Sequence, residues 1–545
     1  MEVTYPALSG GRVILRNNEK HTVRYNRVLS AYLGLRIRGP IGAEVLIQPN
    51  ERNAPGFHRM TVVVLRAGTT YYEFPTMDSF STVNLQVVNA TGPVEIEEVR
   101  ASFVSYPVSY RGAFESSDAE LNRIWQASRW ATQICMQTHH LDSPHHQEPI
   151  SDFGDYLIEA AENYYAFGEP WLIRQDLRKF GLLLRQSGYL NFHTSYSLLW
   201  LQSLLEYYDY TGDAALVKEL APVAHGLLDR FTGWRGKNGL ISEAPNYMFM
   251  DWVNIAGIPC HHPPAVIGQG YMTAFYYRGL ADGMRIAELL RDGERSARYR
   301  SLRTEVAAAF QRELWDPERG LYRDGKPFQT TVAPGQWLPA DTAIETFSPH
   351  VNALAVLYDL APESARAPML QKVMAGGQPN VQPYFMHFLF AAMSHAGLFE
   401  TYAVPQMQRW RLHPDTGTMA EMWGSGDLSH GWVGTPLIQM SARILGVTPS
   451  SPGFQTVAIR PLPSGLTSAR GKVPTPRGDV EVSWKRTGAA LSLDVVIPAT
   501  STAEVILPGR EAVTLDGSTV ARNAQGAVAV SPGRHNLSVL LGRGE

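Results

Sequence analysis

The spacing of apolar residues changes twice along this chain of 545 residues, and that change limits the fold more than any other feature of the sequence. Before about residue 110, three windows between residues 61 and 104 are rich in β-branched and aromatic residues and are separated by Gly, Pro and Asn, which is typical of strands. After about residue 450, apolar and polar residues alternate again, as in residues 480–485. We therefore predict a β-sandwich domain over residues 1–112 and another over residues 451–545.

Between these β regions the apolar spacing is helical. Ser117 and Glu120 have the spacing of a capping box, and apolar residues recur at helical intervals as far as Cys135. Ten further helical windows follow, at about residues 151–166, 169–187, 196–210, 213–232, 266–292, 296–314, 345–359, 364–375, 384–398 and 431–445. Two layers of six helices, paired as hairpins, would use twelve helices. With long loops rich in Trp, His, Asp and Pro, this favours an (α/α)6 barrel over residues 113–450 rather than a simple bundle.

The composition argues against several classes of function. The chain has 48 Lys and Arg against 51 Asp and Glu, a net charge of −3, and no long charged run, so we expect neither a nucleic acid nor a membrane as a partner. The longest apolar runs fall far short of the ~20 residues that span a bilayer, which predicts a soluble protein. No signal peptide is visible at the N-terminus, so the compartment stays open between cytoplasmic and periplasmic or secreted. Cys135 and Cys260 lack the spacing of a zinc or redox motif and are predicted to be buried apolar residues.

The densest polar cluster covers residues 139–155, between two predicted helices. Pro144 and Pro149 keep this segment from joining either helix. Four histidines beside Asp142 raise the possibility of a metal site. Neither the paired histidines of a zincin helix nor a Cys partner is present. We therefore predict no metal and no cofactor, and expect this segment to bond a polar ligand or to be plain loop structure.

The helix predicted after this cluster has an acidic face. An apolar stripe runs from Phe153 to Tyr164, whereas Asp152, Asp155, Glu159 and Glu162 share another face. Carboxylates on helices are usually exposed, so Glu159 and Glu162 are predicted to be solvated. Asp155, one turn from the loop cluster, is the stronger functional candidate.

A second polar cluster lies far downstream, over residues 415–432. It carries Glu421 and Trp423 on a Gly-rich segment, and further loop aromatics occur at Trp252 and Trp337. Indole rings stack on the apolar face of a sugar ring, and carboxylates accept hydrogen bonds from its hydroxyls. Two separated carboxylates in an aromatic pocket are what glycoside hydrolysis requires. One protonates the leaving oxygen, and the other activates the nucleophile or acts as it.

These residues resemble a known family. Asp142-Ser143-Pro144, Glu148 and Gly154-Asp155 resemble the Asp-Cys-Pro-x-Arg-x-Glu-Arg-x-Gly-Trp-x-Gly-Asp signature of the α-L-rhamnosidases of glycoside hydrolase family 78, with the same spacing from first to last Asp. Residues 418–423, Thr-Met-Ala-Glu-Met-Trp, look like the later Thr-x-x-Glu-x-Trp stretch of the family. Ser429-His430 resembles its Ser-x-x-His region, and Asp251-Trp252 is similar to its Asp-Trp pair. The resemblance extends over residues 115–460 and suits the flanking β domains.

The resemblance implies an (α/α)6 barrel that removes terminal α-L-rhamnose, with inversion, from a plant or microbial glycoside or polysaccharide. By position, it implies that Glu148 is the general acid and that Glu421 is the base that activates water. It implies that Asp142 and Asp155 bind sugar hydroxyls, and that Trp252, Trp423 and His430 hold the ring. The remaining candidates for substrate binding are His146, Asp152, Asp251 and Trp337. An inverting mechanism also requires the two carboxyls to lie about 6.5 to 9.5 Å apart.

The sequence departs from the family signature around the implied acid. Ser143 replaces the Cys, His146 and Pro149 replace two Arg, and Ser151-Asp152 replaces the Gly-Trp. The charge beside the leaving group therefore differs, which leaves a different aglycone or terminal sugar open. The alternatives are a related barrel hydrolase for another sugar, a polysaccharide lyase and a noncatalytic sugar-binding protein.

Overall fold

The computed structural model describes residues 2–6, 11–52, 59–148, 152–189, 193–244, 249–331, 343–509 and 511–541. The chain forms two compact units, each made of three segments. The first unit comprises Met1–Ser109, Gln126–Glu148 and Trp410–Gly434, and the second comprises Tyr110–Trp125, Pro149–Arg409 and Thr435–Glu545. Both implied catalytic glutamates, Glu148 and Glu421, therefore belong to the first unit. The domain boundaries near residues 112 and 450 remain a prediction.

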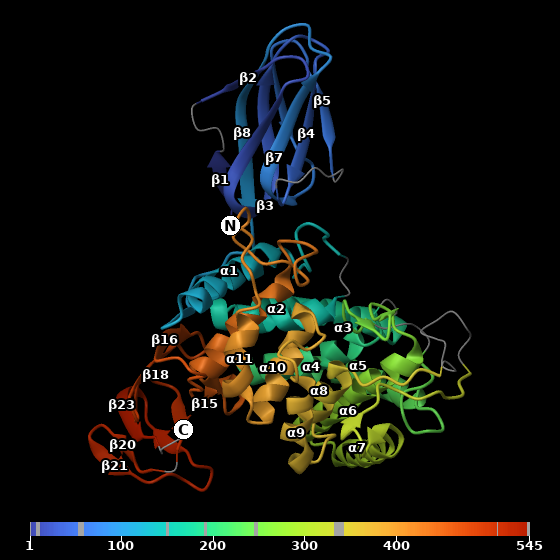
Figure 1. The fold of residues 1–545 in the computed structure, drawn as a ribbon, viewed down its shortest axis with the longest axis vertical. Coiled ribbons are helices and arrows are strands. Elements are labelled where there is room, and N and C mark those ends of the chain that lie inside the picture. Colours follow the sequence, from blue (N-terminus) through green and yellow to red (C-terminus); the bar gives the residue numbers. More distant parts are fainter. Residues whose placement is uncertain are drawn as a thin grey trace. The chain divides into compact units, whose positions relative to one another are not determined.

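The first unit is built on antiparallel strands, which run side by side in Figure 1. The strands are β1 (Glu2–Pro6), β2 (Val13–Leu15), β3 (Lys20–Arg38), β4 (Glu44–Asn50), β5 (Thr61–Val64), β6 (Thr69–Glu73), β7 (Asp78–Val88) and β8 (Val94–Val104). Their order is β1-β8-β3-β7-β4-β5, with β2 paired to β8 and β6 paired to β3. Along β4, buried and half-buried side chains alternate at every position, as expected for a strand with one face on a core. The three predicted strand windows correspond to β5, β7 and β8, whereas the longest strand, β3, was not predicted.

A helical segment completes the core of this β-sandwich. The last part of α1 (Ala119–Cys135) contributes Trp130, Ile134 and Cys135 to the same buried cluster as the strands. The Trp130 ring stacks on Phe103 with ring centres 5.3 Å apart, and its indole N–H donates to the carbonyl oxygen of Val28 at 2.8 Å. These contacts fix the end of α1, and with it the start of the polar loop that follows.

The second unit contains a ring of helices. The α-helices after α1 are α2 (Phe153–Ala166), α3 (Trp171–Ser187), α4 (Tyr196–Thr211), α5 (Ala214–Gly233), α6 (Ala265–Leu289), α7 (Gly293–Leu314), α8 (Pro349–Leu357), α9 (Glu363–Val373), α10 (Pro383–His395), α11 (Phe399–Met407) and α12 (Thr435–Gln439). The even-numbered helices contact one another in sequence from α2 to α12, and α12 contacts α2 again. This closed inner ring is the geometry of an (α/α)6 barrel, and Figure 1 labels α2, α4, α6, α8 and α10 of it.

The helical predictions need three corrections. Helix α11 was missed, because it has only nine residues and Pro405 lies inside it. The cap of α1 is Asp118 rather than Ser117, since the Asp118 Oδ1 accepts hydrogen bonds from the N–H groups of Glu120 and Leu121 at 2.8 and 3.1 Å. Glu159 and Glu162 are buried rather than solvated. Helix α2 belongs to the inner ring and contacts α4 and α12, so its acidic face is covered.

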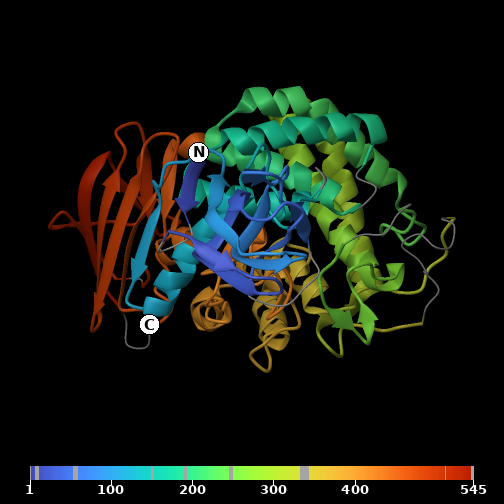
Figure 2. The same ribbon diagram turned by 90° about the horizontal axis from the view of Figure 1, so that it is seen from above.

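The C-terminal part of the second unit is β structure, drawn in red as a curved sheet in Figure 2. Its strands are β14 (Val447–Pro449), β15 (Thr456–Ile459), β16 (Ser468–Val473), β17 (Val480–Thr487), β18 (Ala490–Ile497), β19 (Thr502–Val505), β20 (Val513–Leu515), β21 (Ser518–Val520), β22 (Val528–Val530) and β23 (Gly533–Leu540). One sheet has the order β21-β20-β23-β18-β17-β16-β9, so that β9 (Ala113–Ser116), from far upstream, forms its edge. A four-stranded sheet, β14-β15-β19-β22, accompanies it.

The structure bears on two further predictions, one about the cysteines and one about membrane-spanning helices. Cys135 and Cys260 are both buried free thiols, as predicted. Within the described residues, every helix is too short or too polar to cross a bilayer.

Candidate active site

The loop that follows α1 is folded back on itself around Asp142. The Asp142 Oδ1 accepts a hydrogen bond from the backbone N–H of Glu148 at 2.9 Å, and the Ser143 hydroxyl accepts one from the N–H of His146 at 2.9 Å. Gln147 has a positive φ of 52°, which is uncommon for a residue with a side chain, and it turns the chain directly before Glu148. Asp142 therefore fixes the backbone at Glu148, whose side chain is half-buried. We call this segment the 142–148 loop.

Glu421 is held by hydrogen bonds within its own segment, the 415–430 loop, and by one from Trp432, just beyond it. The Glu421 N–H donates to the carbonyl oxygen of Asp427 at 2.8 Å, and the Asp427 N–H donates to the Glu421 Oε2 at 3.3 Å. The Trp432 indole N–H donates to the carbonyl oxygen of Glu421 at 3.0 Å. Two glycines with positive φ, Gly424 and Gly426, form the turn between the two acids. The Glu421 side chain is buried, with 6% of its surface exposed.

Asp427 joins the two loops. Its Oδ2 accepts a hydrogen bond from the Ser143 hydroxyl at 2.6 Å and lies 3.1 Å from the Nδ1 of His146. A backbone hydrogen bond of 2.7 Å from the Gly431 N–H to the carbonyl oxygen of Asp142 adds a second link. The segments on which Glu148 and Glu421 lie, far apart in the sequence, are therefore held together by direct contacts.

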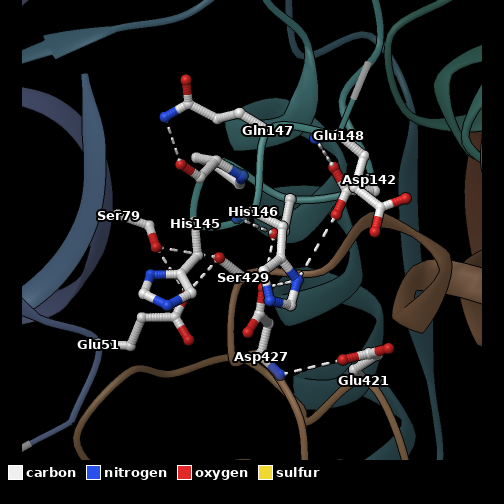
Figure 3. Close-up of polar contacts among 12 residues, drawn as sticks. Glu51, Ser79, Asp142, His145, His146, Gln147, Glu148, Glu421, Asp427 and Ser429 are labelled. Carbon is white, nitrogen blue, oxygen red and sulfur yellow. Dashed lines mark hydrogen bonds and ion pairs between the residues drawn. The ribbon is translucent and has the colours of Figure 1, made fainter. Parts of the chain in front are cut away.

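A histidine lies at the centre of this acidic cluster. Figure 3 shows His146 between Asp142 and Asp427, with Glu148 beside Asp142 and Glu421 beside Asp427. The His146 Nδ1 is 3.9 Å from the Asp142 Oδ2, in addition to its shorter contact with Asp427. This is the position at which the family signature has an Arg, so His146 supplies the cation there when it is protonated.

The charges of the cluster follow from these contacts. Burial raises the pKa of Asp142 to about 7, and burial together with the Asp427 charge raises the pKa of Glu421 to about 7. The hydrogen bond to Asp427 raises the pKa of His146 to about 9. Burial acts to raise the pKa of Asp427, but its hydrogen bonds, that from His146 first, lower it to about 2. At pH 7, His146 and Asp427 therefore form an ion pair, while Asp142 and Glu421 are each partly protonated.

A half-buried carboxylate from the β-sandwich supports the 415–430 loop. Glu51, which follows β4, accepts hydrogen bonds from the Leu428 N–H at 2.6 Å, from the Ser79 hydroxyl at 2.7 Å and from the Ser429 hydroxyl. Burial, followed by the nearby Asp427 charge, raises the pKa of Glu51. Sequence reasoning missed Glu51 because no local pattern distinguishes it from a surface glutamate at the end of a strand.

The β-sandwich also contacts the 142–148 loop. The Asp78 Oδ1, at the start of β7, lies 2.8 Å from the guanidinium of Arg59 and 3.7 Å from the Nδ1 of His145. The Gln147 Nε2 donates to the carbonyl oxygen of Met77 at 2.7 Å. Both loops are therefore anchored to the same strand ends.

Two further candidates lie in or next to the 415–430 loop in the first unit. His430 is buried with its ring centre 4.0 Å from that of Trp432, and burial lowers its pKa to about 3, so it is neutral. Trp423 is half-buried and meets Trp410 edge to face, with ring centres 4.7 Å apart.

The remaining described candidates belong to the second unit. The buried Asp251 Oδ2 accepts hydrogen bonds from the His350 Nε2 at 2.8 Å and the Gln382 N–H at 2.9 Å, and its Oδ1 accepts one from the Trp252 N–H at 2.8 Å. Trp252 is 37% exposed and stacks on His261 with ring centres 4.1 Å apart. Most of the hydrogen-bonding capacity of Asp251 is thus used within the protein, and Asp251 orients an exposed indole.

Asp152 and Asp155 are both buried at the start of α2, where Asp152 occupies the cap position. Trp337 lies outside the described residues.

Sequence reasoning also left Asp427 out of the candidate residues, although an acidic residue on a Gly-rich loop, six positions after Glu421, was a usable signal.

Comparison with known protein families shows to which family the chain belongs. The profile of the bacterial α-L-rhamnosidase 6 hairpin glycosidase domain matches residues 109–444. The chain belongs to this family. The profile of the bacterial α-L-rhamnosidase C-terminal domain matches residues 446–522. The predicted family and the predicted fold class, an (α/α)6 barrel flanked by an N-terminal β-sandwich and a C-terminal β domain, are thereby confirmed.

Individual α-L-rhamnosidases are distant relatives of this chain. One from Alteromonas sp. is 24% identical over 455 residues, which cover 75% of this chain and 46% of that protein. One from Streptomyces avermitilis is 26% identical over 328 residues, which cover 55% of this chain and 28% of that protein. The chain therefore spans less than half the length of these curated relatives.

Solved structures share the fold. The family 78 rhamnosidase of Bacillus sp. GL1 superposes with a TM-score of 0.77 at 23% identity, covering 93% of this chain and 54% of the other. The Streptomyces avermitilis α-L-rhamnosidase complexed with L-rhamnose superposes with a TM-score of 0.73 at 18% identity, covering 99% of this chain and 54% of the other.

Proposed function

We propose that this chain is an exo-acting, inverting α-L-rhamnosidase that needs no cofactor. The observation that carries the proposal is the cluster in which Asp142, His146 and Asp427 connect the segments of Glu148 and Glu421. Glu148 protonates the glycosidic oxygen as the bond to the sugar breaks. Glu421 removes a proton from the water that attacks the opposite face of the anomeric carbon, and the configuration inverts.

The electrostatics around Glu421 suit a base. A carboxylate whose pKa is about 7 accepts a proton more readily than an ordinary carboxylate, and it still ionises near neutral pH. The Asp427 charge favours the protonated form of Glu421, and the His146 cation limits this effect. The ion pair therefore sets the pH range in which Glu421 works.

We also propose that the sugar-binding roles implied by the family resemblance apply here. Asp142, Asp155 and Asp251 would accept hydrogen bonds from sugar hydroxyls or orient groups that do. Trp252 supports this role because its indole is partly exposed and held by stacking on His261. The further candidates are His146, Asp152, Trp337, Trp423 and His430.

A panel of aryl glycosides tests the reaction. Incubated with 4-nitrophenyl α-L-rhamnoside and followed by proton NMR, the full chain is expected to release L-rhamnose with the β anomer appearing first. Initial release of the α anomer would contradict inversion. If the chain cleaved another aryl glycoside of the panel and not the rhamnoside, the terminal sugar that it removes would be a different one. An unsaturated product that absorbs in the ultraviolet would indicate a lyase, and binding without release would indicate a noncatalytic protein.

The pH dependence tests the role of Asp427. In the wild type, kcat/KM is expected to fall as the pH drops through about 7, because the raised pKa of Glu421 means that the base becomes protonated there. Asp427→Asn removes the charge that raises this pKa, so the fall of kcat/KM on the acidic side of the pH profile should move to lower pH. At the same time kcat should fall roughly 10- to 100-fold, since the contacts to Ser143 and His146 are weakened. Asp415→Asn, in the same loop, serves as the control. If the pH at which kcat/KM falls were the same in Asp427→Asn as in the wild type, Asp427 would not control the pKa of Glu421.

The turn beside Glu421 offers a matched pair of variants. A Cβ at Gly426 would lie 2.4 Å from the Oε2 and 2.8 Å from the Cβ of Glu421, whereas a Cβ at Gly424 would have nothing within 4 Å. Both glycines have nearly the same positive φ, so both alanine variants carry a comparable backbone strain of about 1–3 kcal/mol. Only Gly426→Ala is expected to lower kcat, by at least about tenfold. Equal kcat values in the two variants would show that the position of Glu421 is unimportant.

A further inference from the structure

A cavity inside the second unit is lined by aromatic rings and a few polar groups. Its volume is about 280 Å³, and it lies among α2, α4, α6 and α10, which Figure 1 labels. Its aromatic lining includes Tyr164, Tyr210, Tyr358, Phe388 and Phe454. Cavities with apolar, aromatic walls and a few polar groups are typical of sites for small molecules.

One of the polar groups is an arginine for which the described residues provide no ion-pair partner. Arg443 lies on a π-helical turn, Met440–Ile444, directly after α12, and such turns are frequent at functional sites. Its Nε is buried and lacks a hydrogen-bond partner among the described residues, and burial lowers its pKa. The other arginine of the cavity, Arg278, is already paired, since it donates to both carboxylate oxygens of Asp282 at 3.0 Å. Arg443 as a whole is half-buried. A partly buried charge without a partner is costly, so an anion entering the cavity would relieve that cost.

Two further groups can bond to the polar atoms of a ligand. His387 is kept neutral because burial lowers its pKa to about 4, and its buried Nδ1 lacks a hydrogen-bond partner among the described residues. Glu206 accepts a hydrogen bond from Gln202 at 2.8 Å, and burial raises its pKa to about 7. Near neutral pH the protonated form of Glu206 can donate to a hydroxyl, and the ionised form can accept from one.

We propose that this cavity binds a small ring compound that carries a carboxylate and a hydroxyl. The carboxylate would pair with the Arg443 guanidinium, whose planar fork matches two carboxylate oxygens. The ring would lie between the aromatic walls, and the hydroxyl would bond to Glu206. Both phenolic acids and sugar acids have this chemistry. The site does not depend on the proposed reaction, because its residues are distinct from the glutamate cluster.

Calorimetric titration of the full chain tests the site, with 4-hydroxybenzoate representing phenolic acids and D-glucuronate representing sugar acids. At least one of the two is expected to bind with a Kd of about 1 mM or tighter. The acid that binds shows whether the ligand is a phenolic acid or a sugar acid. Its neutral methyl ester should bind at least about tenfold more weakly, since the charge-assisted pair is lost. Arg443→Met should also weaken binding of the acid at least about tenfold. Arg460→Gln is the control, because Arg460 is an exposed neighbouring arginine outside the cavity.

A stability measurement separates binding from a structural role. Without ligand, Arg443→Met is expected to have a Tm equal to or above that of the wild type, because the variant removes a partly buried charge that has no ion-pair partner among the described residues. Failure of both acids to bind would overturn the proposal, and so would equal binding by wild type and Arg443→Met. A large fall in the Tm of Arg443→Met, or its failure to fold, would also overturn it, since Arg443 would then have a structural partner.

Discussion

Glu421→Gln is expected to lower kcat on aryl α-L-rhamnosides about 10³-fold, since a positioned base contributes about 10²- to 10⁴-fold to a reaction of this kind. The amide cannot accept the proton of the attacking water. The Gln side chain has nearly the same shape, and the backbone bonds of residue 421 to Asp427 and Trp432 do not involve the carboxylate. The chain should therefore stay folded, as circular dichroism and the Tm would show.

A small anion gives a second readout for the same variant. Azide needs no base to attack the anomeric carbon, so millimolar azide should restore part of the kcat of Glu421→Gln and form a rhamnosyl azide. Glu363→Gln, an exposed carboxylate on α9, is the control and should keep the wild-type rate. If Glu421→Gln turned over near the wild-type rate, Glu421 would have no part in the mechanism.

Glu148→Gln is expected to lower kcat to a similar extent, about 10³-fold, on substrates with a poor leaving group. The general acid matters most when the departing oxygen needs a proton. With a 2,4-dinitrophenyl leaving group, which departs as a stable anion, the loss should be small. Steady-state kinetics on a phenyl and a dinitrophenyl α-L-rhamnoside would measure both values.

The control for this variant lies in the same loop. Gln147→Glu leaves Glu148 in place and should not reproduce the dependence on the leaving group, although Gln147 bonds to Met77 and Pro144 and its replacement can reduce the Tm. A Glu148→Gln variant that was equally slow on both substrates would remove Glu148 from the role of acid.

The order of the domains could be predicted from the sequence because it depends on local spacing. Strands with period 2 and helices with period 3.6 leave their pattern in each short window. Helix α11 was missed since its nine residues are close to the minimum for a recognisable pattern, and Pro405 argues against a helix. The burial of Glu159 and Glu162 could not be predicted either, because it depends on α2 lying in the inner ring, where α4 and α12 contact it.

The candidate site was predictable only as far as its loops carry a recognisable spacing. Glu148 and Glu421 lie in such segments, and the structure brings those segments together through Asp427. Glu51 could not be found in this way, since its contacts with Leu428 and Ser429 join residues that are very distant in the sequence. Long-range support of this kind leaves no signal in a single sequence, although it fixes the geometry on which the proposed chemistry depends.

The most direct test of the central claim, that Glu148 and Glu421 serve as acid and base on the same sugar, compares the two variants across a series of aryl α-L-rhamnosides with increasingly acidic leaving groups. We expect the kcat/KM of Glu148→Gln to rise steeply with leaving-group acidity and that of Glu421→Gln to stay uniformly low. The same dependence in both variants, or an exchange of the two patterns, would contradict the assignment.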